Sequence, residues 1–185
     1  MGQWIDFQQT GGRIGDIIQP QKNSRSSNIK PILLQISDEA MPVQIAQQVK
    51  LALSSHKESS IGVLVHPQHW RLKNAISAEL LKLNIENHAP KGSTDRDNVV
   101  DRPFVIVDSW NALKGVEFDA VIIGGLDKAD EYPDDLDKDF QEKAGIYTAM
   151  TRARDHLVIL YDSKNSIVDI MENALNAPEQ LESED

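Results

Sequence analysis

The stretch Ile61-Gly-Val-Leu-Val65 carries no polar side chain, so a strand formed by it can be buried on both faces. Further short runs share this pattern and are rich in β-branched residues: Ile32–Ile36, Phe104–Val107, Ala120–Ile123 and Leu157–Leu160. Strands that are apolar on both sides are typical of parallel sheets covered by helices. The runs therefore predict a parallel sheet as the centre of the domain.

Segments with helical periodicity separate these runs. Apolar side chains recur at helical spacing in Pro42–Ser54, Leu72–Leu83, about 139–154 and Ser166–Leu175. Strands that alternate with helices in this way favour a doubly wound α/β fold, with helices on both faces of the sheet.

The predicted domain occupies residues 31–176. Residues 1–30 are rich in Gln, Gly and Ser and are interpreted as an irregular arm or linker, and residues 177–185 as an acidic tail. Inside the domain, residues 86–102 are expected to form a loop, with a short strand near Ile85–His88.

The composition excludes several classes of protein. The chain has 185 residues, of which 40% are hydrophobic, and this content excludes an intrinsically disordered chain. It has no cysteine, which excludes a disulfide framework and a thiolate metal site. No stretch approaches the roughly 18 apolar residues of a membrane span, and the first residues lack the apolar region of a signal peptide. We therefore expect a cytoplasmic protein that does not contact membranes.

The formal net charge of −10 is concentrated in two segments. Residues 127–142 hold eight acids and two bases, and residues 179–185 hold four acids and no base. These segments account for the whole net charge and are interpreted as a solvated loop and a tail. A face for DNA elsewhere on the domain stays possible, although nothing indicates an autonomous basic DNA-binding module.

The first candidate site follows the strand that is predicted to end near Asp108. Ligands of open α/β sheets bind outside the carboxyl ends of the strands. Lys114 and Gly115 could approach a phosphate there, with Gly115 allowing a positive φ, and Glu117 could accept hydrogen bonds from a ribose. Taken alone, the segment is better interpreted as an ordinary turn followed by an exposed carboxylate, before the strand that starts at Phe118.

The second candidate site is Thr148–Asp155, where a predicted helix carrying Thr151, Arg152 and Arg154 runs into an apolar strand. The planar, permanently charged guanidinium group is suited to reaching a polyphosphate. Taken alone, the two arginines could instead complement the dipole at the end of the helix.

Together, the two segments resemble motifs five and six of the UvrD/Rep-type superfamily 1 DNA helicases. The helicase patterns are T-x-H-x-x-K-G-L-E-F-D-x-V and Y-V-A-x-T-R-A-R/K-x-x-L. This chain reads Ser109-Trp-Asn-Ala-Leu-Lys-Gly-Val-Glu-Phe-Asp-Ala-Val121 and Tyr147-Thr-Ala-Met-Thr-Arg-Ala-Arg-Asp-His-Leu157. The resemblance covers about residues 30–162. It implies the C-terminal, second RecA-like motor domain of a helicase, with a parallel sheet of the P-loop NTPase type.

The resemblance also implies roles in ATP hydrolysis. Arg152 would be the arginine finger, pointing into the interdomain cleft toward the γ-phosphate, while Arg154 would be solvated or in a local ion pair. Glu117 would hold the ribose, and Lys114 and Gly115 would shape the cleft. The segment from motif five and Arg152 are expected to open onto one edge of the sheet.

Further residues are implied to face single-stranded DNA. These are Ser109 and Asn111 in motif five and Gln68 after an earlier strand. Trp110 could stack on a base or pack against the sheet, whereas Trp70, at the start of a predicted helix, is expected in the core.

Motif five also departs from the helicase pattern. Asn111 replaces the usual His and Ser109 the usual Thr, so neither adds charge. Asp108, just before them, would repel a phosphate if it pointed outward.

The chain lacks its own phosphate loop, because no G-x-x-x-x-G-K-[ST] pattern occurs. ATP and Mg²⁺ would be held mainly by a partner, the N-terminal RecA-like helicase domain, and the isolated chain is expected to be an inactive monomer. No protein metal site is predicted, since His66 and His69 have no evident third ligand.

Two other functions remain open. A non-catalytic interaction or regulatory module derived from a helicase could dock partners through the acidic residues 127–142. A free-standing nucleotide-binding enzyme is disfavoured, because no Gly-rich phosphate loop follows any strand.

Overall fold

The structure is a computed structural model that describes most of the predicted domain. The described residues are 30–55, 59–91, 104–112, 115–129 and 134–176. The predicted arm (apart from its last residue) and the predicted acidic tail lie outside them. Within the described residues, no helix is long and apolar enough to cross a membrane.

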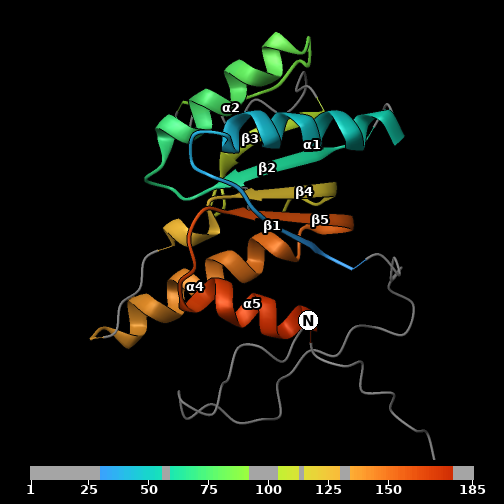
Figure 1. The fold of residues 1–185 in the computed structure, drawn as a ribbon. Helices are drawn as coiled ribbons and strands as arrows, with labels where there is room; N and C mark the ends of the chain where they lie inside the picture. Colours follow the sequence, from blue (N-terminus) through green and yellow to red (C-terminus); the bar gives the residue numbers. More distant parts are fainter. Residues whose placement is uncertain (1–29, 56–58, 92–103, 113–114, 130–133, 177–185) are drawn as a thin grey trace, which may run out of the picture.

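A single parallel sheet forms the centre of the domain (Figure 1). Its strands stand in the order β1-β5-β4-β2-β3, and every neighbouring pair is parallel. The bounds are β1 Ile32–Gln35, β2 Ile61–Val65, β3 Val105–Ser109, β4 Phe118–Gly124 and β5 Ala153–Tyr161. The predicted parallel sheet is confirmed.

Helices cover both faces of this sheet (Figure 1). The bounds are α1 Met41–Ser55, α2 Trp70–Lys82, α4 Leu136–Met150 and α5 Ser166–Asn176, with a short 3₁₀ helix, η3, at Leu126–Lys128. Helices α1 and α2 pack on one face, where Ile45 and Leu80 are completely buried. Helices α4 and α5 pack on the other face, where Ile146 and Val168 are completely buried. Each face of the sheet thus has its own apolar core, as expected for strands whose side chains are apolar on both faces.

Local hydrogen bonds fix where several helices begin and end. The Asp135 carboxylate accepts a hydrogen bond from the Lys138 amide at the start of α4. The Asn165 side chain does the same for the Val168 amide before α5. These are the bonds that satisfy orphan amides at helix N-termini. After α2, Asn84 takes a left-handed φ of 57°, which a short polar side chain tolerates.

The structure corrects three boundaries of the sequence analysis. The helix predicted at about 139–154 ends at Met150, and Arg154 lies in β5, because β5 pairs with β4 from Ala153 onward. The acidic residues 127–142 are not simply a loop, because they include part of η3 and the first half of α4. The strand predicted near Ile85–His88 is a single bridge at its last residue.

Two glycines of the sheet allow a test of how tightly its faces are packed. A Cβ added at Gly62 would lie 2.7 Å from a ring atom of Phe118, while one at Gly124 would lie 2.6 Å from the terminal methyl of Ile45. The ring is buried and wide, whereas a terminal methyl can rotate away. We predict that Gly62→Ala lowers the free energy of unfolding by about 1–3 kcal/mol and that Gly124→Ala costs clearly less. Urea denaturation of both variants measures the difference, and equal losses would contradict this view of the core.

Candidate functional site

The predicted site residues fall at both edges of the sheet. Ser109 is the last residue of β3, at the carboxyl edge. Glu117 and Arg152 immediately precede β4 and β5, at the amino edge. The segment between β3 and β4 has to cross from one edge to the other, because the two strands run in the same direction. The expectation that motif five and Arg152 open together onto one edge is therefore wrong.

At the amino edge, the two motifs are in direct contact. The Arg152 guanidinium donates from Nη1 to the Val116 carbonyl oxygen over 2.8 Å. The backbone of Arg152 accepts a hydrogen bond from the Phe118 amide over 2.9 Å. The end of motif five and Arg152, about thirty residues apart in the sequence, therefore form one cluster, while the start of motif five lies at the other edge.

Arg152 is buried in this cluster. Only 7% of the residue is exposed, and its Nε has no hydrogen-bond partner among the described residues. Burial lowers the pKa of its guanidinium below the ordinary value for arginine. In the chain by itself the side chain is directed to the Val116 carbonyl, and its predicted position in a cleft between two domains stays a prediction. The chain passes from α4 into β5 within two residues, which places the side chain against Val116.

Glu117 and Arg154 form an ion pair beside it, on the surface. Arg154 Nε lies 3.0 Å from Glu117 Oε2, and the side chains are 59% and 62% exposed. Such exposed pairs contribute about 0.2–1 kcal/mol. The local ion pair predicted for Arg154 is confirmed. Gly115 has the positive φ that was predicted for it, 77°, and Lys114 lies outside the described residues.

At the carboxyl edge, the predicted DNA-facing residues differ in exposure. Gln68 and Asn111 are exposed, and Ser109 is half-buried. Trp110 is only 1% exposed, and its ring packs edge-on against His66 at 5.1 Å between ring centroids. Of the two alternatives for Trp110, packing against the sheet is therefore correct and stacking on a base is wrong, because the ring belongs to the core between β3 and α4.

Asp108 does not face outward. It is completely buried and lies 3.0 Å from the Lys73 ammonium, and it also accepts a hydrogen bond from the Ser109 amide. Its charge is balanced inside the protein, so the repulsion of a phosphate that the sequence suggested does not arise.

A pocket of about 290 Å³ opens beside this pair. It lies where β2 and β3 end and α2 begins, and Trp70, Lys73, Lys91 and Ser109 are among its lining residues. Trp70 is 59% exposed, so the prediction that it lies in the core is wrong. The helix turns this side chain outward, while Ile76, six residues later, takes the buried face.

Two pairs of residues near these edges were missed from the sequence. The Asp119 carboxylate accepts hydrogen bonds from the amide and the hydroxyl of Ser60, at 2.8 and 2.9 Å, and so ties the start of β4 to the start of β2. His66 Nε2 lies 3.4 Å from Glu142 Oε1 and connects the end of β2 to α4. Asp119 stands out in the sequence as an acid inside an apolar strand, which could have indicated its pairing with Ser60. No local pattern indicates the contact between His66 and Glu142.

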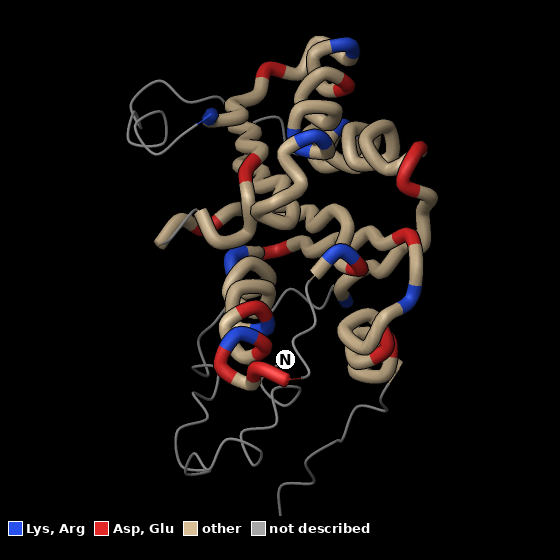
Figure 2. Tube along the Cα trace, turned by 90° about the vertical axis from the view of Figure 1, so that its left-hand side faces the viewer, with Lys and Arg blue, Asp and Glu red and all other residues tan. Residues whose placement is uncertain are grey.

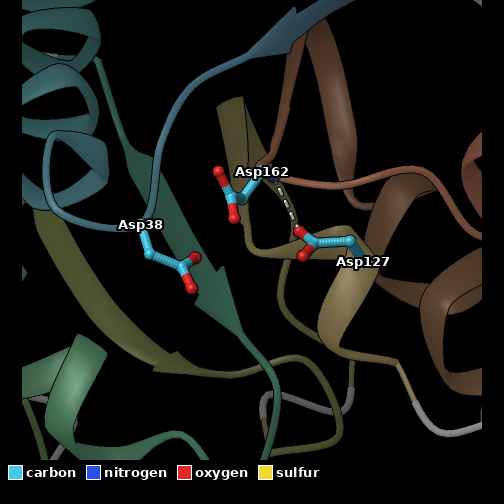
Figure 3. Close-up of side chains that lie close together, drawn as sticks. All are labelled: Asp38, Asp127 and Asp162. Carbon is cyan, nitrogen blue, oxygen red and sulfur yellow. Dashed lines mark hydrogen bonds between the residues drawn. The ribbon is translucent and has the colours of Figure 1, made fainter.

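Asp38, Asp127 and Asp162 converge at the carboxyl edge (Figure 3). Their oxygens lie within 4.8 Å of one another. The Lys128 ammonium lies 2.9 Å from Asp38 and 2.7 Å from Asp127, and the Asp162 amide donates to Asp127 over 2.9 Å. The lysine already supplies the positive charge that such a cluster requires, so the cluster is not interpreted as a metal site.

Comparison with solved structures identifies the fold. The C-terminal domain of a possible DNA helicase from Lactobacillus plantarum WCFS1 matches with a TM-score of 0.58 and 19% identity, over 82% of this chain and 85% of that one. The C-terminal domain of the DEAD-box protein Dbp5 matches with a TM-score of 0.54 and 14% identity, over 80% and 84%. The fold is therefore RecA-like, as predicted. No protein-family model matches the chain, and no curated protein is found to be similar.

Arg152 and Arg154 differ in burial, which yields a stability prediction. Arg152→Ala removes the donor to the buried Val116 carbonyl and should lower the free energy of unfolding by about 1–3 kcal/mol. Arg154→Ala removes only an exposed ion pair and should cost less than about 1 kcal/mol. Urea denaturation of both variants measures the costs. A larger loss in Arg154→Ala would show that the wrong arginine has been assigned to the interior.

The acidic cluster yields a prediction for the pH dependence of stability. Burial alone would raise the pKa of Asp127, but hydrogen bonds from Lys128 and from the Asp162 and Ser163 amides outweigh it and lower the pKa below 3.8. A carboxyl whose pKa is lower in the folded state stabilises the protein above its unfolded pKa and loses that contribution as the pH falls through the folded pKa. Acidification below about pH 4 should therefore destabilise the wild type more than Asp127→Asn.

Thermal melts between neutral pH and about pH 3 provide the measurement. Asp137→Asn is the matched control, because Asp137 is exposed in the first turn of α4. If Asp127→Asn keeps the full acid sensitivity of the wild type, the cluster does not contribute in the way described.

Proposed function

We propose that the chain is the second motor domain of an ATP-dependent DNA helicase of the UvrD/Rep type. The observation that carries the proposal is the contact between the two motif segments at the amino edge, through Arg152 to Val116 and Arg154 to Glu117. This contact occurs on a fold shared with C-terminal domains of helicases. Both features would be expected if the two segments serve one nucleotide site.

On the nucleotide side, the chain would supply the residues that close over ATP. Arg152 would exchange the Val116 carbonyl for the γ-phosphate when a partner domain closes on the amino edge. A guanidinium carries five N–H donors, so it can exchange its hydrogen bond to the neutral Val116 carbonyl for stronger bonds to a charged phosphate. Glu117, already on the surface, would accept hydrogen bonds from the ribose, and Lys114 and Gly115 would shape the cleft. The partner N-terminal RecA-like domain would hold most of ATP and its Mg²⁺.

On the nucleic-acid side, Gln68, Ser109 and Asn111 would contact a single strand at the carboxyl edge. The two proposed sites are joined by α4. The Asn111 side chain lies directly against α4, since a Cβ at Gly145 would be 2.4 Å from its Oδ1. The same helix ends at Met150, just before Arg152. Movement of α4 as a rigid body would therefore couple strand contact to the position of the arginine.

A second candidate function, a non-catalytic docking module, is favoured by the start of α4. Leu136 is 72% exposed there and is flanked by Asp135 and Asp137. Figure 2 shows the acidic and basic bands along this helix. An exposed leucine among acids suits a basic partner surface with an apolar centre. In that case the arginines would be structural residues only.

ATP hydrolysis distinguishes the two functions. The isolated chain should hydrolyse no ATP, with or without single-stranded DNA, because it contains no phosphate loop. Combined with the phosphate-loop domain of its helicase, it should support hydrolysis that depends on DNA. Arg152→Gln should then lower turnover by about 10³-fold or more while ATP still binds, because the guanidinium acts mainly on the transition state. Steady-state ATPase at saturating DNA is the measurement.

Arg154→Ala is the matched control and should stay near the wild-type rate. Thermal melts of each variant separate loss of catalysis from loss of folding, which matters because Arg152 is buried. If Arg154→Ala is the inactive variant, the arginine finger has been misassigned. If both variants hydrolyse ATP normally, the motor function fails and the docking module replaces it.

A further inference from the structure

The pocket at the carboxyl ends of β2 and β3 has the features of a site for one nucleotide unit. Its volume of about 290 Å³ lies at the lower end of the roughly 300–1,000 Å³ of small-molecule sites. Such a space suits one base or one sugar-phosphate rather than a longer ligand. Its polar lining includes Asn74 and Ser109, whose side chains can donate and accept hydrogen bonds.

Trp70 gives this pocket an aromatic wall that is accessible from solvent. A single exposed aromatic residue is ordinary on a protein surface. This one, 59% exposed, borders a pocket, and the Arg71 guanidinium lies 5.4 Å from the centroid of its ring. The guanidinium lies over one face of the ring, which leaves the other face for a base, and aromatic platforms with such arginine contacts are typical of proteins that bind single strands.

The charge around the pocket is positive, in contrast to the chain as a whole. The net charge of −10 is carried by segments elsewhere, whereas Lys73 and Lys91 both line this pocket and only Asp108 opposes them. Asp108 is buried and paired with Lys73, so these two charges balance each other and Lys91 supplies the net positive charge of the lining.

The same pair makes the pocket rigid. The Lys73 ammonium donates to the Pro90 carbonyl and to Asp108, and so holds the segment before Lys91 against the end of β3. The bridge between His88 and Ile106 fixes that segment a second time. A wall that is held in place before the ligand arrives lowers the entropy lost on binding.

From these observations we propose that Trp70 is a stacking platform for one base of a single strand, whose phosphates lie toward Arg71 and Lys91. This inference rests on the proposed function and deepens it, because it adds Trp70, which lies outside both motifs, to the proposed strand contacts. Ser109 lines the same pocket, and the Gln68 amide donates to the lining residue His66, so a strand that crosses Gln68 and Ser109 would also reach Trp70.

Binding of a labelled oligothymidylate to the full chain tests the proposal, with fluorescence anisotropy at low salt as the readout. Trp70→Ala should weaken binding about 5- to 150-fold, the range that corresponds to stacking of about 1–3 kcal/mol per base. Trp70→Phe should restore part of the loss. Leu81→Ala is the matched control, because Leu81 is also 59% exposed and lies on the same helix, and its binding should equal that of the wild type.

An abasic strand of equal length and free dTMP complete the test. Trp70→Ala should bind the abasic strand as well as the wild type does, because that strand offers phosphates but no base to stack. Equal losses for both strands would mean that Trp70 acts through the structure, and they would overturn the proposal. Efficient displacement of the strand by dTMP would identify a site for a free nucleotide instead.

The possible failures separate the two proposals. If the wild type and Trp70→Ala bind oligothymidylate equally, the stacking platform is wrong and the helicase function stands. If neither wild type nor variant binds any strand at low salt, the nucleic-acid part of the proposed function fails, and the platform fails with it.

Discussion

The parallel pairing of β4 with β5 is the constraint on which the arrangement of the proposed sites depends. The two strands begin side by side, with Phe118 opposite Ala153, and the backbone bond from Phe118 to Arg152 lies just outside that pair. Because the strands are parallel and adjacent, whatever precedes them in the sequence must meet at the amino edge. That is how Val116 and Arg152 come into contact from distant parts of the chain.

The same constraint makes α4 the connection between the two edges. A helix that joins two adjacent parallel strands has to run back across the sheet, from the carboxyl edge to the amino edge. It therefore passes the end of β2, where His66 lies 3.4 Å from Glu142, and then Asn111, which rests against Gly145. It ends beside the buried arginine. A strand bound at one edge and a nucleotide bound at the other would both act on this one rigid element.

Two charged side chains are buried in the domain and contribute to its stability through partners inside the chain. Asp108 and Arg152 are both buried, and each has a partner inside the chain, Lys73 for the first and the Val116 carbonyl for the second. Charges are costly to bury without such partners. For Arg152 the partner is a neutral carbonyl, which is a weaker acceptor than a phosphate. Because a phosphate is the stronger acceptor, Arg152 could stabilise the fold through Val116 when no nucleotide is bound and bind the γ-phosphate when ATP is present.

The sequence by itself determined the parallel sheet, the helices on both its faces and the contact between the end of motif five and Arg152. Runs that are apolar on both faces have few other ways to be buried, and the spacing of Gly115 and Arg152 from their strands is local information. Only the tertiary structure decided which side chains are exposed. Trp70 and Trp110 each follow a strand, yet the first is 59% exposed and the second 1%, because exposure depends on whether another element, here α4, covers the position. Which strands are neighbours, and so which segments meet at an edge, was likewise fixed by the order of the strands, which no local pattern encodes.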